Sequence, residues 1–265
     1  MGRKKLIKAA AVQINSVYGS ANENLKKGVG MVKEAAANGA ELICLPELWN
    51  TGYVLNKEFL NKLAEPPEGK TISLFRRLSA ELNVVLIIPF AERGEDSSYY
   101  ISAAVIDKDG SLKGVHRKSL LWGREKEAFQ PGKNEYTVYN TSVGRVGVLI
   151  CYDAEFPEPA RILALKSAEI ITVPSVWSTK AERRWDIQLP ARALDNQVYI
   201  LGVNASGENL CGKSKVINPF GKIIGESPRS EEHILYGGIN KDEIKQAREE
   251  IPYLKDYHLI SKKHE

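Results

Sequence analysis

Short runs of β-branched and other apolar residues alternate along this chain with amphipathic segments of helical periodicity. Such an alternation predicts strand–helix–strand units, in which helices cover a sheet of parallel strands. Strands of this kind are predicted at residues 6–14, 41–45, 84–88, 169–173 and 198–203. Helices are predicted at residues 22–37, 71–82, 158–166, 182–194 and 242–249.

Close pairs of strands interrupt this alternation. The runs at 99–106 and 111–116 flank Asp107-Lys108-Asp109-Gly110, whose turn-forming residues predict a hairpin. The strands number about a dozen, which is more than one twisted open sheet usually carries. We therefore predict an α/β fold of two stacked mixed sheets with helices on the outer faces. A second pair is predicted between strands at 136–139 and 145–150, with its turn around residues 141–144. A final hairpin is predicted around residues 218–221, before a strand at 234–239.

Composition narrows the classes of protein that this chain can be. Its 265 residues are 43% hydrophobic and 26% charged, as in globular proteins, and no linker or low-complexity stretch divides them. We therefore expect a single domain over residues 1–265. No apolar run approaches the roughly 20 residues that cross a bilayer, so no membrane association is expected. The net charge of +4 comes from basic residues scattered among acidic ones, so nucleic acid is not expected as a partner.

The cysteines and the opening segment point to a cytoplasmic protein. Cys44, Cys151 and Cys211 lie far apart and form no CxxC pair, which argues against a disulfide framework and against a zinc site. Lys8 interrupts the first apolar stretch, so we interpret that stretch as a strand and not as a signal peptide.

Residues 207–214 match the phosphate-loop pattern GxxxxGK[ST]. A phosphate loop works by joining a strand to a helix whose N-terminus faces the phosphates. Here the match is followed by a short β run and a turn, which leave no room for a helix. We therefore interpret residues 207–214 as a strand connection, and a nucleotide-binding module remains a rival hypothesis.

Three other segments follow strands and end in reactive side chains. Glu47 comes just after an apolar strand and a proline, where partly dry surroundings can raise the pKa of a carboxylate toward that of a general base. Cys151 lies at a strand-to-helix turn, where backbone N–H groups can face a developing oxyanion. Lys118 follows a strand end and can project a positive charge into a cleft. Alternatively, these residues are a solvated glutamate, a buried small residue and a basic loop.

In this order and spacing, the segments resemble the nitrilase (carbon–nitrogen hydrolase) superfamily. The likeness rests on Leu45-Pro46-Glu47, on Arg117-Lys118 with Phe129-Gln130-Pro131-Gly132, and on Cys151-Tyr152-Asp153-Ala154-Glu155-Phe156-Pro157-Glu158. It continues through Val173-Pro174-Ser175, residues 191–196, residues 212–221 and Pro252-Tyr253-Leu254, and so covers nearly the whole chain.

The resemblance implies an α-β-β-α sandwich and a catalytic triad of Glu47, Lys118 and Cys151, with no metal and no organic cofactor. A second glutamate of the family maps best to Glu125, and Glu127 is the weaker candidate. The sequence departs from the family at Asp195, where glutamate is usual, and at Ala154-Glu155, which puts the rim of the substrate pocket in doubt. The candidate pocket residues are Tyr53, Trp122, Tyr152 and Trp177, of which Tyr53, Trp122 and Trp177 can equally be core packing.

The expected reaction is hydrolysis of a linear aliphatic or ω-substituted amide to a carboxylic acid and ammonia through a cysteine thioester. Hydrolysis of N-carbamoyl amines or of nitriles on the same triad is the alternative. A papain-like Cys–His pair is not supported, because His116 precedes Lys118 at the strand end and is expected to be satisfied there.

The resemblance also implies a homodimer or a higher even assembly. The contact would involve the helices after Pro157 and around residues 182–194. The tail of residues 251–265 would reach over the partner.

Overall fold

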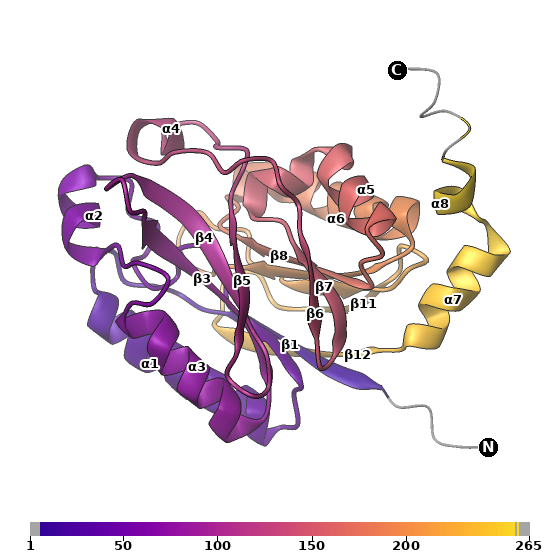
Figure 1. Cartoon of the computed structure of the whole chain (residues 1–265), viewed down its shortest axis with the longest axis horizontal. Coiled ribbons are helices and arrows are strands. Elements are labelled where there is room, and N and C mark those ends of the chain that lie inside the picture. The colour runs from indigo at the N-terminus through magenta and orange to yellow at the C-terminus, as the bar shows by residue number, and fades with distance from the viewer. Residues whose placement is uncertain (1–5, 258, 260–265) are drawn as a thin grey trace.

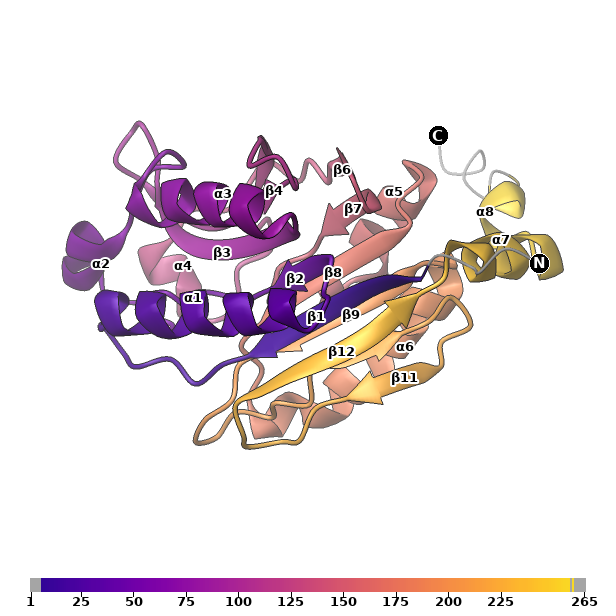
Figure 2. The same ribbon diagram turned by 90° about the horizontal axis from the view of Figure 1, so that it is seen from below.

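The computed structural model describes residues 6–257 and 259. Within this part of the chain, two six-stranded sheets stack against each other, and helices cover both outer faces (Figures 1 and 2). The four-layer α-β-β-α sandwich that the sequence predicts is therefore the observed fold.

The first sheet has the strand order β12-β1-β2-β3-β4-β5. Strands β1, β2 and β3 run parallel, and β3, β4 and β5 form an antiparallel meander. Helices α1 (Ala21–Ala37) and α3 (Lys70–Leu82) bury their apolar faces on its outer side. The strands are β1 (Ile7–Gln13), β2 (Leu42–Cys44), β3 (Val85–Arg93), β4 (Tyr99–Ile106), β5 (Leu112–Arg117) and β12 (His233–Ile239).

The second sheet has the order β11-β10-β9-β8-β7-β6. Strands β7, β8 and β9 run parallel in its centre. Helices α5 (Pro157–Leu165) and α6 (Glu182–Asn196) pack on its outer side, with Pro157 at the first turn of α5, where its missing N–H costs no hydrogen bond. The strands are β6 (Val138–Thr141), β7 (Gly144–Val148), β8 (Ile170–Ser175), β9 (Tyr199–Asn204), β10 (Lys215–Ile217) and β11 (Ile223–Glu226).

Several short elements were not predicted from the sequence. A segment of one or two turns is too short to show a helical period, so its pattern could not be distinguished from a loop. The missed elements are α2 (Lys57–Leu63), α4 (Glu125–Ala128), α8 (Tyr253–Asp256) and the 3₁₀ turns Cys151–Glu155 and Thr179–Ala181. The closing helix α7 spans Lys241–Glu250, close to its predicted range.

The β6–β7 hairpin turns where the sequence predicts, within residues 141–144, but its strands have other bounds. The strand expected at residues 136–139 is β6 at Val138–Thr141, and its partner, expected at 145–150, is β7 at Gly144–Val148. Asp107 Oδ1 accepts hydrogen bonds from the backbone N and Oγ of Ser142 at 2.9 and 2.7 Å, and this tertiary contact supports a tighter turn than expected.

The inner faces of the two sheets form the main core. One contact on the outer side bears directly on the site: a Cβ added to Gly28 of α1 would lie 2.3 Å from the ring of Trp49. Helix α1 therefore packs on Trp49, two residues after Glu47. In the described residues no helix is long and apolar enough to cross a membrane. Of the predicted tail 251–265, residues 258 and 260–265 lie outside the described part.

Candidate active site

Glu47 lies beyond the end of β2, a parallel strand in the middle of the first sheet. Its side chain is fully buried, and its Oε1 accepts a hydrogen bond from Lys118 Nζ at 2.7 Å. The other oxygen, Oε2, has no hydrogen-bond partner among the described residues, and the thiol of Cys151 lies near enough to this carboxylate to affect its pKa.

Lys118 follows the last residue of β5. Its backbone N–H donates to the carbonyl of Ile101, and its own carbonyl accepts from Gly132 N, both at 2.8 Å, so the residue is held between a strand and a returning loop. The buried ammonium also donates to Glu125 Oε1 at 2.8 Å. Two of its three N–H bonds are thus engaged by Glu47 and Glu125, which leaves one for another acceptor.

Glu125, at the first position of α4, is fixed on both oxygens. Its Oε2 accepts from the backbone N–H of Trp122 at 2.8 Å, and Oε1 accepts from the hydroxyl of Tyr53 at 2.6 Å. Tyr53, predicted as a pocket wall, therefore also orients this carboxylate.

Cys151 begins a 3₁₀ turn two residues after Leu149, which still donates to the neighbouring strand β8. Its φ of 51° lies in the left-handed region, which side chains other than glycine adopt mainly at constrained or functional positions. The turn points this residue out of the sheet and brings it to the buried pair of Glu47 and Lys118.

Burial and neighbouring charge change the acidities in this cluster. Removal from water raises the pKa of Glu47 to about 7, and the negative charge of Glu125 adds to the rise, while the ammonium of Lys118 opposes it. Burial also raises the pKa of the Cys151 thiol, and the charge of Glu47 acts in the same direction. A hydrogen bond from the backbone of Val176 opposes this rise. Burial disfavours the charged form of Lys118, but the negative charges of Glu47 and Glu125 and the hydrogen bond to Glu125 raise its pKa.

These directions describe a neutral thiol, a permanent cation and a base that titrates near neutrality. A neutral thiol can act as a nucleophile only if its proton leaves during the attack. Glu47 is the neighbouring group that could accept this proton, because a pKa near 7 suits a general base at physiological pH.

A cavity of about 320 Å³ opens at Cys151. The four residues predicted to line the pocket all border it. Trp177 is buried against Trp185 with ring centroids 5.2 Å apart, whereas Trp122 is 53% exposed at the mouth. The lining residues are Tyr53, Trp122, Cys151, Tyr152, Glu155, Val176, Trp177, Ser178, Lys180, Ala181, Arg184 and Leu210.

The sequence analysis did not identify the charged residues at the mouth of this cavity, Glu155, Lys180 and Arg184, which form its charged rim. Arg184 donates to Glu155 Oε2 at 2.9 Å, and no ion pair is found for Lys180 in the described part of the chain. No local pattern marks these two cations, because they come from a 3₁₀ turn and the first turn of α6. Of the departure from the family at Ala154-Glu155, Glu155 lies on this rim and Ala154 is buried.

Other residues singled out in the sequence lie elsewhere. Glu127 pairs with Arg124 at 3.3 Å on the surface, so of the two glutamates it is Glu125 that contacts Lys118. Asp195 is exposed on α6 and does not line the cavity. His116 lies 3.2 Å from Asp153 and is satisfied inside the protein, as expected. Cys44 and Cys211 are buried, which raises the pKa of both thiols, that of Cys211 to about 12.

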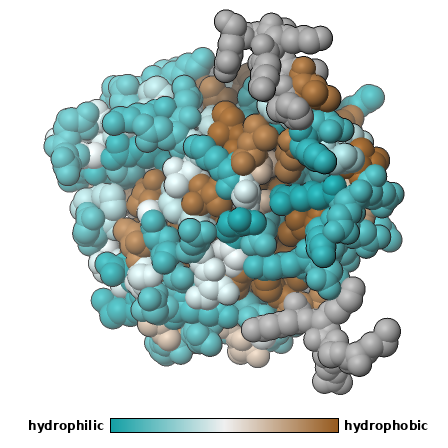
Figure 3. Space-filling view, turned by 45° about the vertical axis from the view of Figure 1, so that its right-hand side comes forward, coloured by the Kyte–Doolittle hydropathy of each residue, from teal (hydrophilic) through white to brown (hydrophobic). Residues whose placement is uncertain are grey.

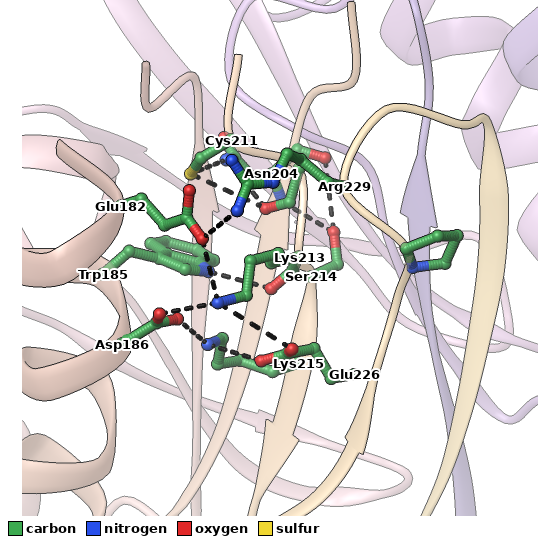
Figure 4. Close-up of polar contacts among 12 residues, drawn as sticks. Glu182, Trp185, Asp186, Asn204, Cys211, Lys213, Ser214, Lys215, Glu226 and Arg229 are labelled. Atoms are coloured by element: carbon green, nitrogen blue, oxygen red, sulfur yellow. Dashed lines mark hydrogen bonds and ion pairs between the residues drawn. The ribbon is translucent and has the colours of Figure 1, made fainter. Parts of the chain in front are cut away.

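The segment that matches the phosphate-loop pattern connects β9 to β10, and no helix follows it. The side chains of its lysine and serine, Lys213 and Ser214, are already occupied, as Figure 4 shows. Lys213 Nζ contacts Asp186 at 2.6 Å and Glu182 at 3.2 Å, both on α6, and Ser214 Oγ donates to Gln13 Oε1 at 2.9 Å. The lysine that would have to bind a phosphate is held by carboxylates instead. Among residues 6–257 and 259, no group of three or more His, Cys, Asp or Glu side chains could hold a metal ion.

Comparison with known proteins extends the likeness over the whole chain. A family model described as carbon–nitrogen hydrolase matches residues 8–249. A nitrilase of Pyrococcus abyssi is 34% identical over 249 residues, covering 92% of this chain and 93% of that protein. An omega-amidase of Xenopus laevis is 30% identical over 246 residues, covering 87% and 88%. The crystal structure of a member of branch 10 of the nitrilase superfamily from Saccharomyces cerevisiae matches with a TM-score of 0.85 at 28% identity, covering 94% and 95%.

Proposed function

The chain belongs to the carbon–nitrogen hydrolase family, and we propose that it hydrolyses short linear or ω-substituted amides to a carboxylic acid and ammonia through a thioester on Cys151. One observation carries this proposal: a buried ammonium, Lys118, lies between two carboxylates and next to a neutral thiol. A fixed cation that neither carboxylate can deprotonate suits the stabilisation of an oxyanion.

The acylation half of the reaction follows from these groups. The sulfur of Cys151 attacks the amide carbonyl carbon while its proton passes to Glu47. The free N–H of Lys118 and the backbone N–H of Tyr152 bind the oxyanion; loss of one such donor typically costs ~2.7–4 kcal/mol. Collapse of this intermediate breaks the C–N bond, and the leaving nitrogen takes the proton from Glu47 and departs as ammonia.

Deacylation reuses the same base. Water attacks the thioester and gives its proton to Glu47, and the second oxyanion binds to the same donors. The C–S bond then breaks, the sulfur regains the proton from Glu47, and the carboxylic acid leaves. No step requires a metal or an organic cofactor.

The sequence after the nucleophile and the oxyanion chemistry both favour an amide over a nitrile. Tyr152-Asp153 is similar to the amidase and carbamoyl-amidase branches, and an omega-amidase is among the relatives. An amide presents a carbonyl oxygen directly to Lys118, whereas a nitrile develops charge on nitrogen and needs a proton there. Since a nitrilase is also a relative, the two substrates must be compared directly.

We therefore expect matched compounds to be cleaved in the order amide, N-carbamoyl amine, nitrile. Ammonia release from the purified protein, measured with panels that share one acyl chain, ranks the three classes. A nitrile turned over tenfold faster than its amide, about 1.4 kcal/mol in the barrier, would contradict the proposal.

The charged rim supports an acidic ω-substituent. Lys180 forms no ion pair in the described chain, whereas Arg184 is paired with Glu155. An unpaired cation at the mouth of an otherwise largely apolar cavity complements a carboxylate at the far end of a short acyl chain. We therefore propose monoamides of short dicarboxylic acids as the preferred amides.

Lys180→Ala is expected to raise KM about tenfold for such an acidic amide, roughly 1.4 kcal/mol of binding, and to leave KM for the neutral amide of equal length unchanged. Arg183→Ala is the matched control, because it removes an exposed cation that does not line the cavity. Equal effects of both variants, or an equal effect on both substrates, would refute a specific contact.

An even homo-oligomer through α5 and α6 is proposed as well. These helices and the segments beside them carry exposed large apolar side chains, and Figure 3, which brings this side forward, shows hydrophobic patches between hydrophilic areas. A two-fold interface would use the same patch on both subunits. The exposed apolar residues are Phe156, Leu165, Ile187, Leu194, Ile251 and Tyr253.

We expect light scattering at micromolar concentration to give at least twice the chain mass of 29.4 kDa. Ile187→Glu with Leu194→Glu should yield monomers, because charges would be buried without partners. Phe59→Glu, on the equally exposed but distant helix α2, should leave the assembly intact. A monomeric wild-type protein would refute the proposal.

The three cysteines are unpaired, which supports a reducing compartment, and we propose the cytoplasm.

A further inference from the structure

Asp153 is a fully buried carboxylate that the reaction does not use, yet its contacts join two groups that the reaction needs. Its Oδ1 accepts from the backbone N–H of Ser119 at 3.1 Å and of Leu120 at 2.9 Å, the two residues directly after Lys118. Its Oδ2 accepts from the N–H of Ile150, directly before Cys151, at 3.1 Å. The same oxygen lies 3.2 Å from Nε2 of His116.

The simplest role for Asp153 is to cap the 3₁₀ turn that begins at Cys151. That role accounts for one contact, the hydrogen bond from Ile150 N. The other three contacts leave the turn and reach residues 116–120, at the end of β5. Strand β5 belongs to the first sheet and the turn follows β7 of the second, so one side chain bonds across the two sheets.

Such a link matters because apolar packing alone does not fix the position of one sheet relative to the other to within a fraction of an ångström. Apolar contacts are non-directional, whereas hydrogen bonds fix distance and angle. An oxyanion must meet Lys118 from one sheet and Tyr152 N–H from the other at about 2.7–3.1 Å. We propose that Asp153 is a positioning residue that sets the placement of the Lys118 ammonium relative to the Cys151 sulfur. The proposal rests on the acyl-transfer function proposed above.

A carboxylate satisfies all four contacts as an acceptor. A carboxylate accepts on both oxygens, so His116 donates through Nε2 and no donor opposes another. An asparagine has the same shape but a single acceptor oxygen. If its NH₂ group takes the place of Oδ1, it faces the backbone N–H groups of Ser119 and Leu120. If the NH₂ group takes the place of Oδ2, it faces the backbone N–H of Ile150. Asp153→Asn therefore keeps the volume and sets a donor against at least one backbone N–H, either directly after Lys118 or directly before Cys151.

The test compares two reactions of Cys151 in the full-length protein. Alkylation by iodoacetamide needs a nucleophilic sulfur but no oxyanion donor, whereas acylation by p-nitrophenyl acetate needs both. For Asp153→Asn we expect acylation to slow at least 30-fold and alkylation less than threefold, since misplacement by about 1 Å can cost 100-fold in rate. Equal slowing of both reactions, or no slowing of either, would overturn the proposal.

Asp107→Asn is the matched control. Asp107 is also buried and accepts backbone N–H bonds from Lys108 and Ser142 at 2.9 Å, but it joins two turns away from Cys151. This variant should lose thermal stability and keep the wild-type ratio of acylation to alkylation. If Asp153→Asn does not fold, His116→Phe, which keeps a ring but removes one contact of four, should lower the same ratio three- to tenfold, and an unchanged ratio would refute the role.

The two proposals fail in different ways. A wild-type protein that the ester acylates but that releases no ammonia from any amide contradicts the amide function and leaves the test of Asp153 valid. A wild-type ratio in Asp153→Asn together with normal amide turnover contradicts the positioning role alone.

Discussion

Cys151→Ala is expected to lower kcat/KM for amide hydrolysis by about 10,000-fold or more while the protein stays folded. The substitution removes the atom that forms the thioester, and the other groups of the site cannot supply a covalent route. Steady-state ammonia release and a thermal melt measure the two quantities. Mass spectrometry of a quenched reaction should show an acyl adduct in the wild-type protein and none in this variant.

Cys44→Ser and Cys211→Ser are the controls for Cys151. Both residues are buried thiols, and neither lines the cavity with the nucleophile. Each should keep most of the activity per folded molecule, although a buried hydroxyl can lower stability. Turnover that survives Cys151→Ala and disappears in Cys211→Ser would mean that the nucleophile has been misassigned.

Glu47→Gln is expected to reduce kcat about 1,000-fold, within the range usual for loss of a positioned general base. The variant keeps the size of the side chain and its contact with Lys118 but cannot take the proton of Cys151. A glutamate acts as a base only when ionised, and the pKa of Glu47 is about 7. The rate should therefore fall about tenfold per pH unit below pH 7 and level off above it.

The pH profile separates this role from a structural one. If Glu47 is the base, the acidic limb near pH 7 should disappear in Glu47→Gln, and the remaining activity should depend on pH differently. Because base, cation and nucleophile act as a unit, adding Glu47→Gln to Cys151→Ala should cost little more than Cys151→Ala alone. An unchanged acidic limb in Glu47→Gln would contradict the assignment.

The order of elements and the two-sheet architecture could be predicted because local patterns carry them. Side chains return to the same face every two residues in a strand and every 3.6 residues in a helix, so long periodic segments such as α1 and β4 can be recognised from the sequence. The false phosphate loop could also be rejected locally, since the β run at β10 leaves no room for a helix. The motifs around Glu47, Lys118 and Cys151 identified the family, because their residues are contiguous in the chain.

Local patterns failed where a distant contact decides the outcome. The turn at Ser142 was predicted, but not its hydrogen bonds to Asp107, which lies 35 residues away. The resemblance favoured Glu125 over Glu127 without deciding between them, and folding buries the first against Lys118 and leaves the second on the surface with Arg124. Tyr53 could be placed near the pocket, yet its hydrogen bond to Glu125, 72 residues away, could not be foreseen.

The sequence by itself determined which side chains are available for the chemistry and on which strand ends they lie. Only the tertiary structure decided their acidity and their alignment. Glu47 and Lys118 are 71 residues apart, and the pKa of Glu47 rises because the two packed sheets exclude water from both. Charge, solvent exclusion and directional contacts such as those of Asp153 arise between segments that come from different sheets, and no pattern within one segment encodes them.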